Sequence, residues 1–236
     1  PNFNKFNMKN ILYLLSFLFV FSLNAQKNKN GNLYDKHPGI DLVAAFHKAY
    51  ANGDIDKASE ILHDDVQWLD GNTNNTVWGG KERILGNINN FKNNFNYVSF
   101  NDSPGAYPDA LEYKKDGNWV QSWFNVYGVH KVTGIELDHP VLRIYGLNDD
   151  STKIVGIIEY SNKRNFDQIA NARTDMENGT IYMSHQHINT VRKVQFAYQN
   201  GDVENAISFF HENATINDIN ESKIMNMDQT LERDGK

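Results

Sequence analysis

One stretch of the sequence occurs twice, and this internal repeat constrains the fold more than any other feature. The segment from Ala49 to Ala58 reads AYANGDIDKA, and the segment from Ala197 to Ala206 reads AYQNGDVENA. The two lie 148 residues apart, and the same offset relates Asp70 to Asp218 without a gap. An offset of this size corresponds to one domain plus a linker and is too long for a solenoid repeat. The sequence therefore predicts tandem copies of one domain.

The repeated unit has the pattern of two helices joined by a tight turn. In the first copy, apolar residues follow the spacing of one helix face at Leu42, Ala45, Phe46, Ala49 and Tyr50. Gly53 suits the left-handed conformation that ends a helix, and Asp54 suits the N-cap of the next helix. We interpret this Asn-Gly-Asp sequence as an architectural hinge.

Beyond this helix pair, the periodicity of the apolar residues changes from that of helices to that of strands. A third helix is predicted after Gly79-Gly80, with an apolar face formed by Ile84, Ile88, Phe91 and Phe95. Alternation then predicts strands at 66–69, 97–100, 110–114, 119–130, 141–145 and 154–160. Three helices and a run of antiparallel strands predict an α+β fold, with the helices packed on one face of a curved sheet.

The N-terminal region has the features of a secretory signal peptide. Met8 and Lys9 precede an apolar run from Ile11 to Leu23, and Ala25 supplies the small residue at its exit. The run is shorter than the roughly 20 apolar residues that a membrane-spanning helix needs. We expect residues 1–25 to be upstream residues and a signal peptide, and the protein to be periplasmic or secreted. An uncleaved membrane anchor is the alternative.

The composition argues against several classes of function. The net charge is −6, from 23 basic and 29 acidic residues, and the sequence has no basic patch, so we expect no nucleic-acid partner. The absence of cysteine excludes disulfides, thiolate metal sites and cysteine nucleophiles. The sequence also lacks an HExxH motif, a serine nucleophile elbow, a phosphate loop and a dinucleotide fingerprint. We therefore predict no metal and no cofactor.

Three motifs of the first copy resemble the NTF2-like superfamily and its SnoaL-like members. They are AYxNGDxxxA at 49–58, HDDVxWxD at 63–70 and GGKE at 79–82. The resemblance implies a cone, with three N-terminal helices packed on a curved antiparallel sheet around a cavity. It implies no single activity, because this fold carries isomerases, dehydratases, epoxide hydrolases, polyketide cyclases and non-catalytic binders.

The resemblance and the repeat together predict the division of the chain. We expect a polar linker at 26–38, an NTF2-like (SnoaL-like) domain at 39–166 and a second linker at 167–184. Residues 185–236 are expected to be the truncated start of a second domain of the same kind.

Asp70 is the first candidate for a catalytic group. Ketosteroid isomerases of this superfamily use an aspartate base, and the motif resemblance places Asp70 at its position. Their hydrogen-bond-donating tyrosine would stand at Phe46, whose ring cannot donate, so we do not expect ketosteroid isomerisation itself. The alternative role of Asp70 is structural, as the side chain of an Asx turn at Gly71-Asn72-Thr73.

The strand at 119–130 provides most of the candidate ligand contacts. Its odd-numbered face mixes aromatic rings with amides, a combination that suits a pocket wall because buried amides need partners. The predicted ligand-binding residues are Trp68, Trp78, Trp123, Asn125 and Tyr127. Sheet packing and a wet outer surface are the alternative for the residues of this strand.

Histidines are the remaining candidates for acid–base chemistry, because imidazole titrates near neutral pH. We select His130 as a second catalytic residue beside Asp70, and we also consider His139. The alternative to a catalytic role is that these histidines lie at strand ends on the protein surface.

Three functions are compatible with these features. We expect an exported protein that binds a small, largely apolar molecule in the cone cavity, and the sequence leaves open whether it is an enzyme. The first alternative is a cofactor-free lyase or isomerase with Asp70 as general base and Tyr127 or His130 as its partner. The second is an assembly module, acting as a homodimer or as an intramolecular pseudo-dimer. Contact with a membrane is expected only through an uncleaved signal segment.

Overall fold

The structure is a computed structural model that describes residues 29–162, 164–173, 176–178, 181–218 and 223–233. The predicted signal peptide lies outside the described residues. Among the described residues, no helix has the length and hydropathy needed to span a membrane.

The helices near the N-terminus begin and end where their capping residues predict. These helices are α2 (Pro38–Asn52), α3 (Ile55–Ile61) and α4 (Lys81–Asn94). Gly53 ends α2 with a φ of 64°, in the left-handed region that glycine adopts without strain. The Asp54 carboxylate begins α3 by accepting a hydrogen bond from the Lys57 N–H. The hinge predicted from the repeat is therefore confirmed.

Eight strands form one sheet, and its topology is mixed. The strands are β1 (Gly31–Tyr34), β2 (Leu62–Asp70), β3 (Thr76–Gly79), β4 (Phe95–Asp102), β5 (Asp109–Tyr113), β6 (Gly117–His130), β7 (Glu136–Leu147) and β8 (Ile154–Ser161). Their order is β1-β5-β6-β7-β8-β2-β3, and β4 pairs with the other end of β6. All pairs are antiparallel except β2 and β8, which run parallel, so the prediction of a purely antiparallel sheet needs this correction.

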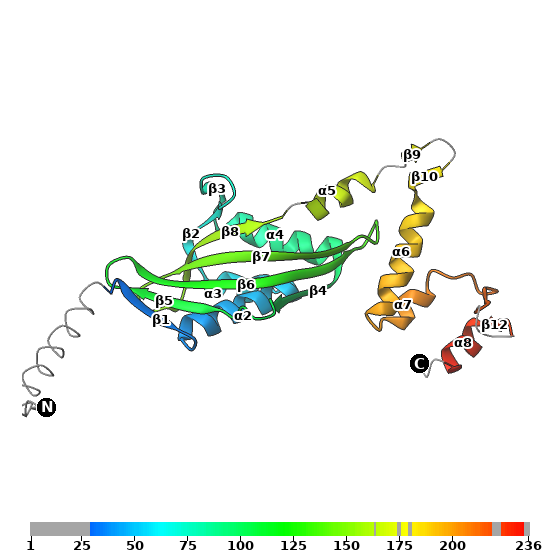
Figure 1. The fold of residues 1–236 in the computed structure, drawn as a ribbon, viewed down its shortest axis with the longest axis horizontal. Coiled ribbons are helices and arrows are strands. Elements are labelled where there is room, and N and C mark those ends of the chain that lie inside the picture. Colours follow the sequence, from blue (N-terminus) through cyan, green and yellow to red (C-terminus); the bar gives the residue numbers. More distant parts are fainter. Residues whose placement is uncertain (1–28, 163, 174–175, 179–180, 219–222, 234–236) are drawn as a thin grey trace, which may run out of the picture.

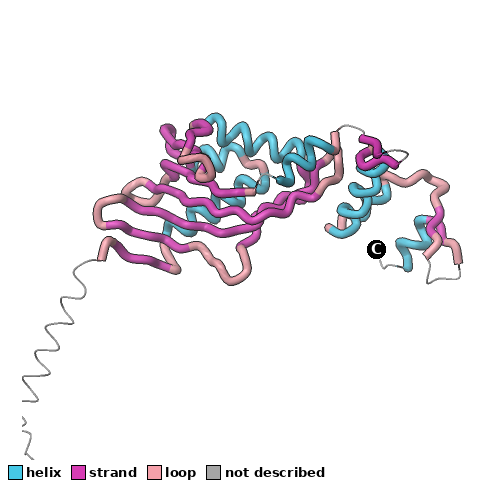
Figure 2. Tube along the Cα trace, turned by 45° about the horizontal axis from the view of Figure 1, so that its top comes forward, coloured by secondary structure: helices cyan, strands magenta, loops and turns pink. Residues whose placement is uncertain are grey.

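The helices cover one face of this open, curved sheet (Figures 1 and 2). The even-numbered residues of β6 point toward the helices, and Val120 and Phe124 are completely buried there. They pack with Phe46 of α2 and Ile88 of α4 in one hydrophobic core. Burial of this apolar surface is the main stabilising contribution, at about 25 cal/mol per Å². The predicted α+β plan of helices on one face of a curved sheet is confirmed.

Two segments expected to be linkers contain regular structure. β1 lies within residues 26–38 and pairs with β5, adding an edge strand to the sheet. The second segment, 167–184, contains most of α5 (Arg164–Asn171), together with β9 (Met176–Asn178) and β10 (Ile181–Ser184). β1 was missed because its four residues, GNLY, are too few to show alternation.

The remaining elements lie beyond the end of the sheet, beside the turn that follows β6 (Figure 1). They are α6 (Gln186–Gln199), α7 (Val203–Ile207), β11 (Thr215–Ile216), β12 (Met225–Asn226) and α8 (Met227–Arg233). We call residues 29–162 the first unit, and residues 185–218 with 223–233 the C-terminal unit.

Candidate functional site

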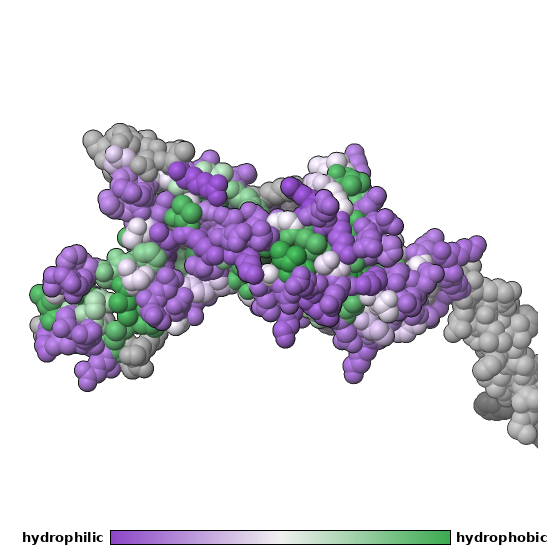
Figure 3. Space-filling model, turned by 180° about the vertical axis from the view of Figure 1, so that it is seen from behind, coloured by the Kyte–Doolittle hydropathy of each residue, from purple (hydrophilic) through white to green (hydrophobic). Residues whose placement is uncertain are grey.

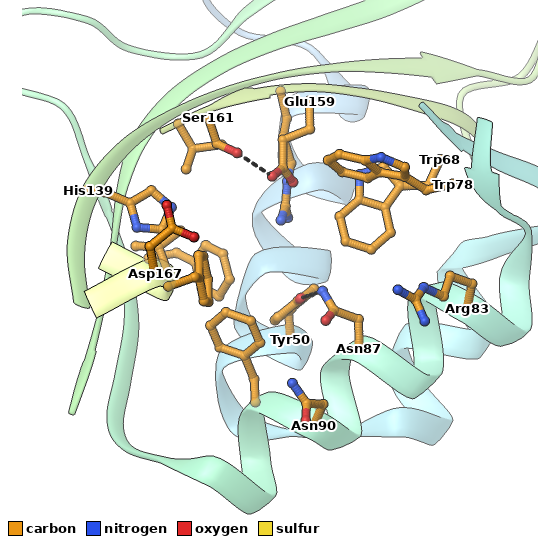
Figure 4. A pocket seen from close by; sticks show the side chains of 16 residues that line it. Tyr50, Trp68, Trp78, Arg83, Asn87, Asn90, His139, Glu159, Ser161 and Asp167 are labelled. Atoms are coloured by element: carbon orange, nitrogen blue, oxygen red, sulfur yellow. Dashed lines mark hydrogen bonds and ion pairs between the residues drawn. The ribbon is translucent and has the colours of Figure 1, made fainter. Parts of the chain in front are cut away.

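A cavity of about 470 Å³ lies between the concave face of the sheet and helices α2, α4 and α5 (Figure 4). Aromatic rings form much of its wall: Tyr50, Trp68, Trp78, Phe91, Phe100 and Phe166. Val126 and Val141 also line it, and the other lining side chains are polar or charged: Arg83, Asn87, Asn90, His139, Arg143, Glu159, Ser161 and Asp167. Apolar walls with a few placed polar groups are typical of small-molecule sites.

Strand and helix periodicities place the polar groups in this cavity. His139 and Arg143 are separated by four residues on β7, so both side chains point to the concave face. Glu159 and Ser161 share that face on β8. On α4, Arg83, Asn87 and Asn90 lie on successive turns and form one polar row along the wall.

A buried ion pair lies in the cavity wall formed by the sheet. Arg143 Nε donates to Glu159 Oε2 at 2.8 Å, and both side chains are at most 10% exposed. Glu159 Oε1 also accepts a hydrogen bond from Ser161 Oγ at 2.8 Å. Burial acts to lower the pKa of Arg143, but the charge of Glu159 outweighs it and raises that pKa above its ordinary value. Arg143 therefore stays cationic in the protein interior.

Aromatic rings surround the Arg143 guanidinium. Its central carbon lies 5.3 Å from the ring centre of Tyr50, 5.5 Å from that of Phe124 and 5.8 Å from that of Trp68. These distances are within the range of cation–π attraction. The rings and Glu159 together compensate the loss of hydration that burial imposes on the cation.

Two buried tyrosines and one histidine extend this polar cluster. The Tyr50 hydroxyl accepts a hydrogen bond from Asn87 Nδ2 at 2.6 Å, and burial raises the Tyr50 pKa, so the hydroxyl remains protonated. Burial also raises the pKa of Tyr145 to about 12. Its hydroxyl lies 2.6 Å from His47 Nε2, and burial together with the Arg143 charge lowers the His47 pKa to about 3. All three groups are therefore neutral at physiological pH.

His139 is the histidine that reaches the cavity. It is 6% exposed, and burial lowers its pKa. Its Nδ1 atom is buried without a hydrogen-bond partner in the described part of the chain. A neutral imidazole with one unused nitrogen can donate to or accept from a ligand.

The structure brings two of the five predicted ligand-binding residues into the cavity. Trp68 and Trp78 both line it, with ring centres 4.9 Å apart and the planes at 85°. This edge-to-face geometry is favourable for aromatic pairs. Trp68 is held on β2 and Trp78 on β3, two antiparallel neighbours at one edge of the sheet.

Trp123, Asn125 and Tyr127 lie on the opposite face of the sheet, so they do not line this cavity. Alternate residues of a strand point to opposite faces, and the even-numbered residues of β6 face the helices. Asn125 Nδ2 instead contacts Asp138 Oδ1 at 3.4 Å, and the Tyr127 hydroxyl accepts a hydrogen bond from Asn200 Nδ2 at 2.8 Å. The alternation was read correctly, but the cavity face was assigned to the wrong side.

The two predicted catalytic residues lie apart from this cavity. Asp70 is 3% exposed at the end of β2, and its Oδ1 accepts a hydrogen bond from the Asn72 N–H at 3.0 Å, as in an Asx turn. His130 is 1% exposed at the end of β6, where the Thr133 N–H donates to its Nδ1 at 3.2 Å. Burial, followed by the Arg173 charge, lowers the His130 pKa. This geometry fits the structural alternative for Asp70.

The sequence reasoning missed Arg143 and Glu159, although a signal was present. Both occupy inward positions of otherwise apolar strands, Arg143 between Val141 and Tyr145, and Glu159 two residues after Ile157. Opposite charges at inward positions of two consecutive predicted strands indicate a buried pair, because a single buried charge is too costly. As for metals, the described residues contain no group of three histidine or acidic side chains that could hold one.

Several solved structures are similar to this chain at low sequence identity. No protein-family model and no curated protein sequence matches the chain. The BvnE pinacolase of Penicillium brevicompactum is a similar solved structure, at 10% identity over 57% of this chain and 89% of that chain, with a TM-score of 0.48. An LEH-like epoxide hydrolase of M. tuberculosis is similar at 17% identity over 56% and 87%, with a TM-score of 0.39.

An NTF2-like protein of unknown function from Cytophaga hutchinsonii is similar at 16% identity over 55% of this chain and 94% of that chain, with a TM-score of 0.39. These identities carry no activity over to this chain. The architecture of the first unit, with its helices on the concave face of an open curved sheet, agrees with the α+β plan predicted from the sequence.

Proposed function

We propose that the first unit binds a small, largely apolar molecule in its cavity, and that the protein does so as an exported binding protein. The observation that carries this proposal is the cavity of about 470 Å³ with aromatic walls. Its size lies within the range of about 300–1,000 Å³ found for ligand pockets. Export is proposed from the signal-peptide pattern at residues 8–25.

The polar groups of the cavity support binding of a molecule with few polar atoms. The Arg143 and Glu159 charges compensate each other, and the Tyr50 hydroxyl already has Asn87 as a partner. Most of the wall therefore offers contact area, and Trp68 Nε1 and His139 Nδ1 are its buried atoms without a hydrogen-bond partner in the described part of the chain. His139, Arg83 and Asn90 remain available to orient a ligand.

A fluorescence titration tests this proposal. N-phenyl-1-naphthylamine is an apolar dye whose emission rises when it leaves water, and we expect saturable binding to the full chain. Asn90→Trp places a large ring at the cavity wall and is expected to weaken binding about tenfold, which corresponds to 1.4 kcal/mol. Asn89→Trp is the matched control, because Asn89 is an exposed residue of α4 outside the cavity lining. Equal binding by both variants, or no saturable binding to the full chain, would contradict the proposal.

An assembly role is the second candidate, and the outer face of the sheet favours it. Trp123, Leu142 and Tyr160 are neighbours across β6, β7 and β8 on that face. Gln121, Ile144 and Ile158 form the next row. Contiguous apolar surface of this kind marks interaction sites. Light scattering of the full chain and of Trp123→Lys tests the homodimer, since a homodimer through this face would dissociate in the variant, and a monomeric full chain would exclude a homodimer.

For an enzymatic role, the imidazole and carboxylate groups that line the cavity are those of His139, Glu159 and Asp167. The carboxylate of Asp70 serves the turn after β2 instead, so a general-base role for Asp70 has no support from its placement.

A further inference from the structure

We infer that the ligand of this cavity carries a carboxylate or similar anionic group on its apolar body, and that Arg83 binds this group. The inference rests on the proposed function, because it assigns the ligand class of the same cavity. It is carried by a cation that faces the cavity without a partner in the described part of the chain.

The two arginines of the cavity differ in their partners. Arg143 is buried and forms its ion pair with Glu159. Arg83 makes no hydrogen bond or ion pair with any residue that the structure describes, and it lines the cavity. Figure 4 shows its guanidinium end directed from α4 into the cavity. A planar guanidinium is suited to two parallel hydrogen bonds with one carboxylate.

The position of Arg83 depends on a glycine in the preceding strand. A Cβ atom at Gly79 would lie 2.7 Å from Arg83 Cβ and 2.9 Å from Arg83 Cγ. The stem of Arg83 therefore lies in the space that a side chain at residue 79 would need. The Gly-Gly sequence between β3 and α4 thus accommodates the arginine as well as the turn.

The walls around Arg83 fit an amphipathic molecule. Asn87 and Asn90 continue the polar row of α4, while Trp68 and Trp78 offer aromatic surface. A carboxylate held at Arg83 would leave its apolar body in contact with those rings. Burial of that body contributes about 25 cal/mol per Å².

The acidic residues of the cavity do not compete for Arg83. Glu159 is bound by Arg143 and by Ser161. Asp167 is exposed on α5, and Figure 4 shows it across the cavity from Arg83. The negative charge of Asp167 disfavours an anionic group near α5. The charges of Asp167 and Arg83 therefore both favour a carboxylate at the α4 wall.

Three ligands of equal chain length test the inference. Decanoate, decanol and decylammonium are each used to displace N-phenyl-1-naphthylamine from the full chain. We expect decanoate to bind about tenfold more tightly than decanol, and decylammonium to bind most weakly. Arg83→Gln is expected to remove the advantage of decanoate over decanol. Glu82→Gln, one residue away and outside the cavity lining, is expected to retain that advantage.

The outcomes separate this inference from the proposed function. If decanol and decanoate bind equally to the full chain, or if Arg83→Gln keeps the preference for decanoate, the inference is wrong and the apolar cavity stands. If decylammonium binds most tightly, Asp167 is the anchor and the inference is likewise wrong. If neither the dye nor any of the three ligands binds, the proposed function itself fails.

Discussion

The first unit and the C-terminal unit contain the same pair of helices in two different surroundings. In the first unit, the sheet covers α2, and Val43 and Tyr50 are 1% and 2% exposed. Their counterparts on α6, 148 residues later, are Val191 and Tyr198, which are 65% and 43% exposed. The helix pair therefore forms the same local structure in both surroundings, while its burial depends on the sheet.

The turn between the helices has similar local geometry in both units. Gly53 and Gly201 have φ values of 64° and 74°. Asp54 and Asp202 each accept a hydrogen bond at the start of the following helix. Histidine caps also recur, since His37 and His185 both accept a hydrogen bond from the N–H two residues ahead. These features depend only on neighbouring residues, so they form without a sheet.

The apolar face of the C-terminal helices is left with a hollow of about 260 Å³. Val194, Tyr198, Ala206 and Phe210 line it, and their counterparts in the first unit are Phe46, Tyr50, Ala58 and Leu62, all core residues. Figure 3 shows hydrophobic side chains gathered on this unit. In its described residues, the C-terminal unit has only the two-residue strands β11 and β12. In the first unit, the corresponding residues pack in the core formed by the helices and the sheet.

Breaking the buried Arg143–Glu159 ion pair of the first unit should give a large loss of stability. Arg143→Gln leaves the Glu159 carboxylate buried without its cation, and we expect the free energy of unfolding to fall by about 3–5 kcal/mol. Urea unfolding followed by tryptophan fluorescence measures this in the first unit, because all four tryptophans lie there. The double variant Arg143→Leu/Glu159→Leu should lose less than the single variant. A double variant that is less stable than Arg143→Gln would show that the pair itself stabilises the fold.

A matched pair of tyrosines tests the difference in burial directly. Tyr50→Ala should lower the free energy of unfolding by about 3–5 kcal/mol, because it opens a cavity in the core. Tyr198→Ala at the equivalent exposed position should change it by no more than about 0.5 kcal/mol. Urea unfolding by far-ultraviolet circular dichroism reports on both units. A large loss in Tyr198→Ala would mean that the C-terminal hollow is covered in solution.

The third expected effect depends on pH and on a position where the units differ. His47 has a pKa lowered to about 3 from its ordinary 6.5, so the unfolded chain binds more protons than the folded one between these values. Its contribution is present above pH 6.5 and is lost as pH falls toward 3. The C-terminal unit has Gln195 at this position, so His47→Gln copies the repeat. The variant should show a smaller loss of stability between pH 7 and pH 4.

Urea unfolding at several pH values measures this slope. His130 and His139 also have lowered pKa values, and they remain in the variant, so part of the slope should persist. An unchanged slope in His47→Gln would show that His47 is hydrated in the folded state.

The sequence predicted those parts of the fold that depend on local patterns. Helix periodicity, the Gly-Asp hinge and the alternation of the long strands all follow from neighbouring residues, and they were confirmed. Phe95 was assigned to the third helix, but it is the first residue of β4. Helix and strand meet there without a turn residue between them, so the pattern contained no boundary signal.

The site was harder to predict because it depends on which face of each strand meets the helices. Both faces of β6 carry large side chains, and only the pairing of the strands decides that Phe124 points inward and Trp123 outward. Trp68 and Trp78, the two candidates outside this strand, do line the cavity. Arg83 directly follows the GGKE motif and is close in sequence to Trp68 and Trp78. It could have been selected as a cation beside these two aromatic rings.

The smallest expected effect concerns the capping aspartates of the two units. Asp54→Ala removes the acceptor for the Lys57 N–H and should lower the free energy of unfolding of the first unit by about 1 kcal/mol. Asp202→Ala should leave tryptophan-detected unfolding unchanged and increase amide hydrogen exchange in α7. Asp54→Asn retains a capping oxygen and should be close to the unsubstituted chain.

Asp202 has an additional contact that Asp54 lacks, because the Tyr97 hydroxyl of β4 donates to its carboxylate at 2.7 Å. Tyr97→Phe removes this contact, together with the hydrogen bond that the same hydroxyl accepts from Asn205 Nδ2, and leaves the cap. If the cap alone stabilises α7, hydrogen exchange in Tyr97→Phe should match that of the unsubstituted chain. Exchange as fast as in Asp202→Ala would mean that the contact with the first unit holds α7, and the two hinges would then differ in what stabilises them.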